Sequence, residues 1–289
     1  MKNNILVIII SLSALCIGCN KPEQVPAYIY LKPFSLTTDA ATEGANTAKI
    51  TDAWVYSEDV LLGAFTLPAE IPVLREGDTK ITIFPGIRNN GNNASPTEYF
   101  NYVPFVIQKK LVPTKTDTIF PATTYNKTLT FRWLEDFEGS INTLNNNVDQ
   151  DDSTNIAVTG IDVKYGKKCA LFQVDKKHPV MAVTSQFPYD KIPTNSRIYV
   201  EMDYKSDVPI LVEIYGIASA SNQQLLDAAT FREKSDWNKT YINFSKNILN
   251  NYVSYSIVFS AVLPIDANGQ YTKDKGEARI DNIKLVYPK

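Results

Sequence analysis

Residues 197–204 read Arg-Ile-Tyr-Val-Glu-Met-Asp-Tyr, with apolar side chains at every second position from Ile198 to Tyr204 and the carboxylates Glu201 and Asp203 between them. A period of two is typical of a β-strand, because successive side chains of a strand point to opposite faces of the sheet. The stretch therefore predicts a strand with one apolar face.

Similar alternating segments recur along the whole chain and are separated by turn residues. They cover residues 28–31, 54–56, 80–84, 105–107, 128–133, 170–174, 210–215, 240–244, 255–259 and 278–287. Residues 50–65 predict a hairpin around Ser57-Glu58-Asp59, and one short helical turn is expected at most in residues 222–230. Many short strands spaced by turns predict an all-β protein built of β-sandwiches.

The N-terminus has the pattern of an export signal. A short basic start is followed by an apolar run over residues 5–15, which is shorter than the roughly 20 residues that a membrane-spanning helix needs. The next residues, Cys16-Ile-Gly-Cys19, resemble the lipobox of bacterial lipoproteins. We expect a signal peptide over residues 1–18 and a lipid on Cys19. The alternatives are a plain secretory signal cleaved near Gly18 and a buried apolar helix.

A lipid on Cys19 would fix the position of the chain relative to a membrane. Two or more acyl chains give stable anchoring, and the tether, residues 19–26, reaches at most about 30 Å at about 3.5 Å per residue. Asn20 is not the Asp that commonly holds such lipoproteins at the inner membrane. The resemblance therefore implies the outer membrane, and it favours the cell surface over the periplasmic face.

Composition argues against several classes of function. The net charge of −2 gives no electrostatic footprint for nucleic acid. His178 is the only histidine, so a multi-histidine metal site is excluded, and no Gly-x-Ser-x-Gly motif is present. Outside the N-terminal segment Cys169 is the only cysteine, and we expect it to be buried as a small apolar residue. These features predict a protein that is not an enzyme.

The length suits two domains, and the strand pattern divides them near residue 134. We expect an immunoglobulin-like sandwich over residues 27–134 and a second sandwich over residues 135–289. Residues 86–96 form a long polar loop, and loops on a rigid sandwich often carry binding residues. Its Asn90 and Asn92 are candidate ligand or partner contacts.

A second candidate contact surface is the aromatic stretch over residues 99–105. Aromatic side chains are enriched in the cores of protein interfaces. The candidates are Tyr99, Phe100, Tyr102 and Phe105. The alternative is that these side chains are buried in the sandwich.

Three motifs in the second half resemble those of carbohydrate-binding-module-like jelly rolls, also called galactose-binding-like domains. They are Asp136-Phe-Glu-Gly139, Asp236-Trp-Asn-Lys-Thr-Tyr-Ile-Asn-Phe244 and the closing Ile280-Asp-Asn-Ile-Lys-Leu285. The resemblance covers about 150 residues and implies a jelly roll. It leaves the ligand open, because such domains bind sugars or proteins.

The resemblance also implies a possible metal site. Many jelly rolls of this type hold a structural calcium between an acid of the opening strand and the Asp of the closing strand, here Glu138 and Asp281. Calcium binds six to eight oxygens. The alternative is that the two carboxylates cap strand ends or form ion pairs, and no cofactor is required.

The first half, with Ile50-Thr-Asp-Ala-Trp-Val-Tyr56 leading to Thr82-Ile-Phe-Pro-Gly86, is similar to the N-terminal immunoglobulin-like domain of cell-envelope lipoproteins. The resemblance implies an accessory lipoprotein beside an outer-membrane β-barrel or another envelope protein. Our main hypothesis is a non-catalytic binding or scaffold subunit of an outer-membrane complex for barrel assembly, secretion or uptake.

Two other hypotheses stay open at this point. The first is a glycan-binding surface lipoprotein of a polysaccharide-uptake system. The second is a hydrolase that uses Asp136 and Glu138, because paired carboxylates about 5–9.5 Å apart hydrolyse glycosides.

Overall fold

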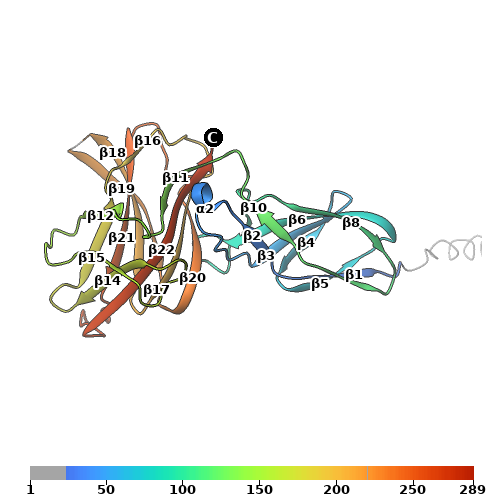
Figure 1. Ribbon diagram of the computed structural model, residues 1–289, viewed down its shortest axis with the longest axis horizontal. Helices are drawn as coiled ribbons and strands as arrows, with labels where there is room; N and C mark the ends of the chain where they lie inside the picture. The colour runs from blue at the N-terminus through green and yellow to red at the C-terminus, as the bar shows by residue number, and fades with distance from the viewer. Residues whose placement is uncertain (1–23, 220) are drawn as a thin grey trace, which may run out of the picture.

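The computed structural model describes residues 24–219 and 221–289, and almost all of its regular structure is β-strand. The predicted signal peptide and the acylated Cys19 lie outside these residues. None of the helices in the described part is long and apolar enough to cross a membrane. The fold consists of two β-sandwiches arranged along the long axis of the molecule (Figure 1).

The first sandwich packs a small sheet against a larger one. The small sheet has the order β5 (Ala69–Val73), β1 (Ala27–Leu31), β9 (Thr116–Ile119), and a short ladder pairs β2 (Ser35–Thr37) with β10 (Ala122–Thr124). The larger sheet contains β3 (Asp52–Ser57), β4 (Val60–Thr66), β6 (Gly77–Arg88), β7 (Pro96–Glu98) and β8 (Phe105–Leu111). Buried side chains from both sheets, among them Ile29, Val55 and Ile83, form one core. The finer assignment to the immunoglobulin-like topology stays a prediction.

The second sandwich packs two antiparallel sheets of six strands face to face. One sheet has the order β13 (Ala157–Thr159), β14 (Cys169–Asp175), β22 (Lys275–Pro288), β17 (Tyr199–Ser206), β20 (Lys234–Asn243), and β11 (Leu129–Glu135) also pairs with β22. The other has the order β12 (Leu144–Asn147), β15 (Val180–Ser185), β21 (Ser254–Val262), β18 (Ile210–Ser219), β19 (Asn222–Phe231), and β16 (Tyr189–Asp190) pairs with β21. This is the two-sheet arrangement expected of a jelly roll.

The polar face of β17 lies between the two sandwiches. Val200 and Met202 point into the second core, as the alternation predicts, but Glu201 and Asp203 on the opposite face are also fully buried. The first sandwich and the loop before β3 cover that face. β22 behaves in the same way, because its Lys284 is buried and donates to the Ala45 carbonyl at 2.7 Å.

A buried polar and aromatic cluster joins the sandwiches. The Tyr99 and Tyr125 hydroxyls of the first sandwich each donate to the Glu201 carboxylate at 2.7 Å. The Lys239 ammonium lies 3.4 Å from the same carboxylate, and the Tyr102 and Tyr241 hydroxyls share a hydrogen bond of 3.2 Å. We call the residues of this contact the interdomain cluster. The apolar and aromatic members are Leu36, Ile50, Ile87, Tyr99, Tyr102, Tyr125, Leu129, Tyr199, Tyr241 and Val286, and the charged members are Glu201, Asp203, Lys239 and Lys284.

The structure differs from the sequence predictions at two places. The domain boundary precedes β11 rather than following residue 134, because β11 pairs with β22 along its whole length. Residues 222–230 form the edge strand β19 rather than a helical turn, because they pair with β18. The predicted hairpin is confirmed, with Glu58 and Asp59 both at positive φ between β3 and β4, as a two-residue hairpin turn requires.

Candidate functional site

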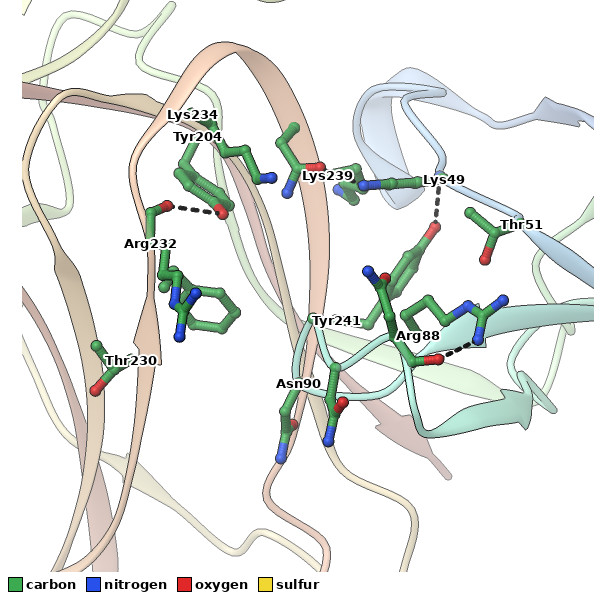
Figure 2. A pocket seen from close by; sticks show the side chains of 15 residues that line it. Lys49, Thr51, Arg88, Asn90, Tyr204, Thr230, Arg232, Lys234, Lys239 and Tyr241 are labelled. Carbon is green, nitrogen blue, oxygen red and sulfur yellow. Dashed lines mark hydrogen bonds between the residues drawn. The ribbon is translucent and has the colours of Figure 1, made fainter.

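A cleft of about 370 Å³ opens where the two sandwiches meet, beside the interdomain cluster (Figure 2). The first sandwich contributes the loop before β3 and the loop after β6, and the second contributes β17, the end of β19 and the start of β20. The size lies within the range of small-molecule pockets, about 300–1,000 Å³. Residues from both sandwiches are needed to build it.

The loop after β6 forms one wall of the cleft. The Arg88 guanidinium closes its base by donating to Asp52 Oδ1 at 2.7 Å and to the Asn93 carbonyl. Asn90 and Gly91 have positive φ values of 52° and 68°, a region that asparagine and glycine adopt more readily than other residues. This reversal of the chain presents Asn92 to the cleft.

The same loop is fastened to the second sandwich. The Asn90 backbone N–H donates to the Tyr241 carbonyl at 2.9 Å, and its side-chain oxygen accepts from the Asn243 backbone N–H at 2.7 Å. The Tyr241 hydroxyl in turn accepts from the Lys49 backbone N–H at 3.0 Å. These bonds hold the two loops of the first sandwich against β20 and so fix the position of this wall of the cleft.

The opposite wall is the hairpin between β19 and β20, with β17 behind it. The rings of Tyr204 and Phe231 lie 5.7 Å apart, and the Tyr204 hydroxyl donates to the Arg232 carbonyl at 3.3 Å. Figure 2 shows Arg232 and Lys234 on this wall, facing Lys49 and Arg88 across the cleft. Both rings belong to the core of the second sandwich and are only 2% and 4% exposed, so the wall offers mainly the exposed cationic groups of Arg232 and Lys234.

The lining of the cleft carries five cationic side chains and no carboxylate. Two of the cations are compensated from outside the lining. Arg88 pairs with Asp52 at 2.7 Å, and Lys239 lies 3.4 Å from Glu201 and 3.7 Å from Asp203. The other three are Lys49, Arg232 and Lys234. In the described part of the chain, none of these three has a carboxylate oxygen within 4.0 Å.

The lining of the cleft is rich in hydrogen-bonding groups. Its side chains are amides, hydroxyls, aromatic rings, lysines and arginines, and it holds no carboxylate, histidine or cysteine. Burial, and then the charge of Lys234, lower the pKa of the Lys49 ammonium. The cleft is thus a region of positive potential lined with hydrogen-bond donors.

A second hollow, of about 560 Å³, lies on the outer face of the sheet that contains β15, β18 and β21. Leu211, Glu213 and Ser260 contribute to it, together with the carboxylates Asp149 and Asp151. It is more open than the cleft, and burial raises the pKa of Glu213. Its acidic lining would repel an anionic ligand.

The predicted contact residues fall into two groups. Asn90 and Asn92 line the cleft. The aromatic stretch is different, because Tyr99 and Tyr102 are only 1% and 2% exposed within the interdomain cluster. The prediction that these two tyrosines contact an external partner is therefore wrong, since they contact the second sandwich of the same chain.

The other two aromatic candidates do not line the cleft. Phe100 is exposed and stacks with the Arg197 guanidinium of the second sandwich, which lies 4.0 Å from the ring centroid. Phe105 is half-buried against the core of the first sandwich. Lys49, Arg232 and Lys234 were missed, because isolated basic residues beside strands look like ordinary solvated side chains.

The two predicted calcium ligands hold the same loop. Glu138 Oε1 accepts from the Lys167 and Lys168 backbone N–H groups at 2.6 and 2.7 Å, and Asp281 Oδ2 accepts from the Tyr165 backbone N–H at 3.2 Å. Calcium is bound by oxygen atoms, whereas these carboxylates face N–H donors. Within the described residues no group of three or more His, Cys, Asp or Glu side chains could hold a metal. The surroundings of these two carboxylates therefore do not fit a calcium site.

The isolated residues with possible chemistry are held by local contacts. Cys169 is fully buried, as expected, and burial raises the pKa of its thiol to about 11. His178 pairs through Nδ1 with Asp151 at 2.5 Å at the surface, and the hydrogen bond raises the pKa of the imidazole. Neither residue lines the cleft.

Comparisons with known proteins reach only the level of architecture. No protein-family model matches the sequence, and no curated protein is similar to it. A solved xylan-binding domain from Paenibacillus barcinonensis is similar over 54% of this chain and 99% of its own, with 9% identity and a TM-score of 0.39. A family 11 carbohydrate-binding module of a Clostridium thermocellum cellulase is similar over 52% and 91%, with 16% identity and a TM-score of 0.37. Similarities of this extent identify neither a ligand nor a function.

Proposed function

We propose that this chain is a non-catalytic glycan-binding protein whose binding site is the cleft between its two sandwiches. The observation that supports the proposal is the lining, which gathers the amides of Asn90, Asn92 and Asn238 from both sandwiches. Amides donate to and accept from sugar hydroxyls.

Pre-organisation supports the same proposal. The loop that carries Asn92 is held by hydrogen bonds to Tyr241 and Asn243 of the second sandwich. A wall that is already ordered loses little conformational entropy when a ligand binds. The absence of an acid–base pair from the lining agrees with binding without hydrolysis.

The proposal includes attachment to the outer membrane through a lipid on Cys19, with exposure at the cell surface. The start of β1 lies at the end of the first sandwich that is remote from the second (Figure 1). A lipid anchor there would leave the first sandwich as a spacer and hold the cleft away from the bilayer. An accessory subunit of an outer-membrane complex stays a prediction, which affinity purification from solubilised membranes would test.

The test is a glycan array probed with the purified chain, followed by calorimetry with the glycan that binds best. We expect Asn92→Ala to weaken binding about tenfold, because it removes the amide donor from the wall and the bond of 2.9 Å from the Ala94 backbone N–H to Asn92 Oδ1 within the loop. Asn250→Ala, at an exposed position outside the cleft, is the matched control. No binding to any glycan, or equal binding by the two variants, would overturn the proposal.

A further inference from the structure

We propose that the cleft selects acidic saccharides, and that the three uncompensated cations Lys49, Arg232 and Lys234 recognise the negative charge of the sugar. The inference rests on the proposed function, since it specifies which glycans the same cleft takes. A neutral sugar needs only hydrogen-bond partners for its hydroxyl groups. The positive charge of the lining therefore indicates a further preference, for anionic ligands.

The position of Lys49 and Lys234 is the main observation. They come from different sandwiches, and Figure 2 shows their side chains extending toward each other at one end of the cleft. The partner of the Lys49 ammonium is a neutral group, Asn238 Oδ1, at 2.5 Å. The two ammonium groups repel each other, and the repulsion is stronger in a partly buried site, where the effective dielectric is lower than that of water. A bound anion between them would turn this repulsion into attraction.

The remaining charges show that this excess is local. Arg88 and Lys239 also line the cleft, but Asp52, Glu201 and Asp203 already neutralise them from the interior. Arg88 and Lys239 are therefore paired with carboxylates, whereas Lys49, Arg232 and Lys234 line the cleft without such a partner among the described residues.

The turn between β19 and β20 also contains an acid. Glu233 lies between Arg232 and Lys234 in the sequence, is exposed, and does not line the cleft. Burial is the main cause that raises the pKa of the Tyr204 hydroxyl, and the negative charge of Glu233 acts in the same direction. The charge that a ligand meets in the cleft is still positive, because the lining holds no carboxylate.

The chemistry of the ligand follows from these groups together. A carboxylate or sulfate on a sugar ring can accept from the Lys49 and Lys234 ammonium groups, while the ring hydroxyls reach the amides of Asn90 and Asn92. A free inorganic anion would use only the cations, and a neutral sugar only the amides. An acidic saccharide uses both sets.

The experiment uses calorimetry with the full chain purified in detergent. The probes are acidic oligosaccharides (uronate, sulfated and sialylated), their neutral counterparts, such as the methyl ester of an oligogalacturonate, and inorganic phosphate alone. We expect binding to at least one acidic probe, at least tenfold weaker binding to its neutral counterpart, and affinity that falls as salt rises. Phosphate alone should bind more weakly than the acidic saccharide.

Variants locate the charge recognition. Lys49→Gln, Lys234→Gln and Arg232→Gln should each weaken binding of the acidic probe about tenfold, with little change for the neutral one. Lys246→Gln, exposed and outside the cleft, is the control. Melting temperatures equal to that of the unmodified chain exclude misfolding, and Arg232→Gln alters only an exposed side chain.

The outcomes separate this inference from the proposed function. Equal affinity for acidic and neutral probes, or acidic binding that all three variants retain, overturns charge selection and leaves glycan binding intact. Saturation by phosphate at the affinity of the acidic saccharide replaces the saccharide with an inorganic anion. No binding to any saccharide overturns both proposals.

Discussion

The substitution Tyr99→Phe tests whether the interdomain cluster stabilises the fold. Tyr99 is 1% exposed, and its hydroxyl donates to Glu201 Oε1 at 2.7 Å inside a contact from which water is excluded. A hydrogen bond to a charged group contributes about 1.5–3 kcal/mol to stability. Phenylalanine keeps the ring packing but removes the hydroxyl, which donates to Glu201 and also accepts from Asn101 Nδ2 at 3.0 Å. We therefore expect the free energy of unfolding to fall by about 2 kcal/mol.

The assay is urea denaturation followed by tryptophan fluorescence, with two comparisons. Tyr165→Phe changes a tyrosine that is 43% exposed and should alter stability by less than about 0.5 kcal/mol. The double variant with Glu201→Gln should show a coupling of about 1–2 kcal/mol, since the two groups are in direct contact. If Tyr99→Phe costs no more than Tyr165→Phe, the bond to Glu201 does not hold the sandwiches together.

Three further predictions concern the strands and loops around the site. Gly86→Ala should destabilise the chain by about 1–3 kcal/mol in the same assay, because the new Cβ would lie 2.4 Å from the Trp54 ring and 3.0 Å from the Asp52 carbonyl oxygen; unchanged stability would show that the ring moves freely. Burial raises the pKa of Asp281 to about 7, so between about pH 4 and pH 7 the folded chain keeps a proton that the unfolded chain has lost. Stability should therefore fall as the pH rises through this range. Asp281→Asn, which imitates the protonated form, should flatten this slope in melting curves recorded across that range, and an unaltered slope would assign it to other groups. Calcium should leave the melting temperature unchanged, because N–H groups face the Glu138 carboxylate; a rise that Glu138→Gln abolishes would restore the calcium hypothesis.

The strands were predictable from the sequence, but the use of their polar faces was not. The alternation in residues 197–204 identifies β17 and its apolar face. The alternation cannot tell whether Glu201 and Asp203 face water or another domain, because carboxylates at every second position occur on strands in both situations. Only the fold shows that two tyrosine hydroxyls and Lys239 satisfy Glu201.

The aromatic stretch shows a related limit. Tyr99 and Tyr102 are aromatic residues of the kind that is enriched in protein interfaces. They do lie in an interface, but it is formed with the second sandwich of the same chain. Composition reports that an aromatic surface will be covered and does not report what covers it. The sequence therefore indicated that this aromatic surface would be covered, but the partner that covers it was predicted wrongly.

The cleft itself was only half predictable. The long polar loop indicated Asn90 and Asn92, because an asparagine-rich loop on a sandwich is a common place for binding residues. Lys49 and Asn238, which are hydrogen-bonded, lie 189 positions apart in the sequence, and no local pattern connects them. A site assembled from two domains becomes visible only when their contact is known.

The most direct test of charge recognition in the cleft is a structure of the chain with an acidic oligosaccharide bound. We expect the sugar in the cleft between the sandwiches, with its anionic group between Lys49 and Lys234 and its hydroxyls on Asn90 and Asn92. A sugar bound instead on the outer face of the second sandwich, against Leu211, Glu213 and Ser260, would contradict it.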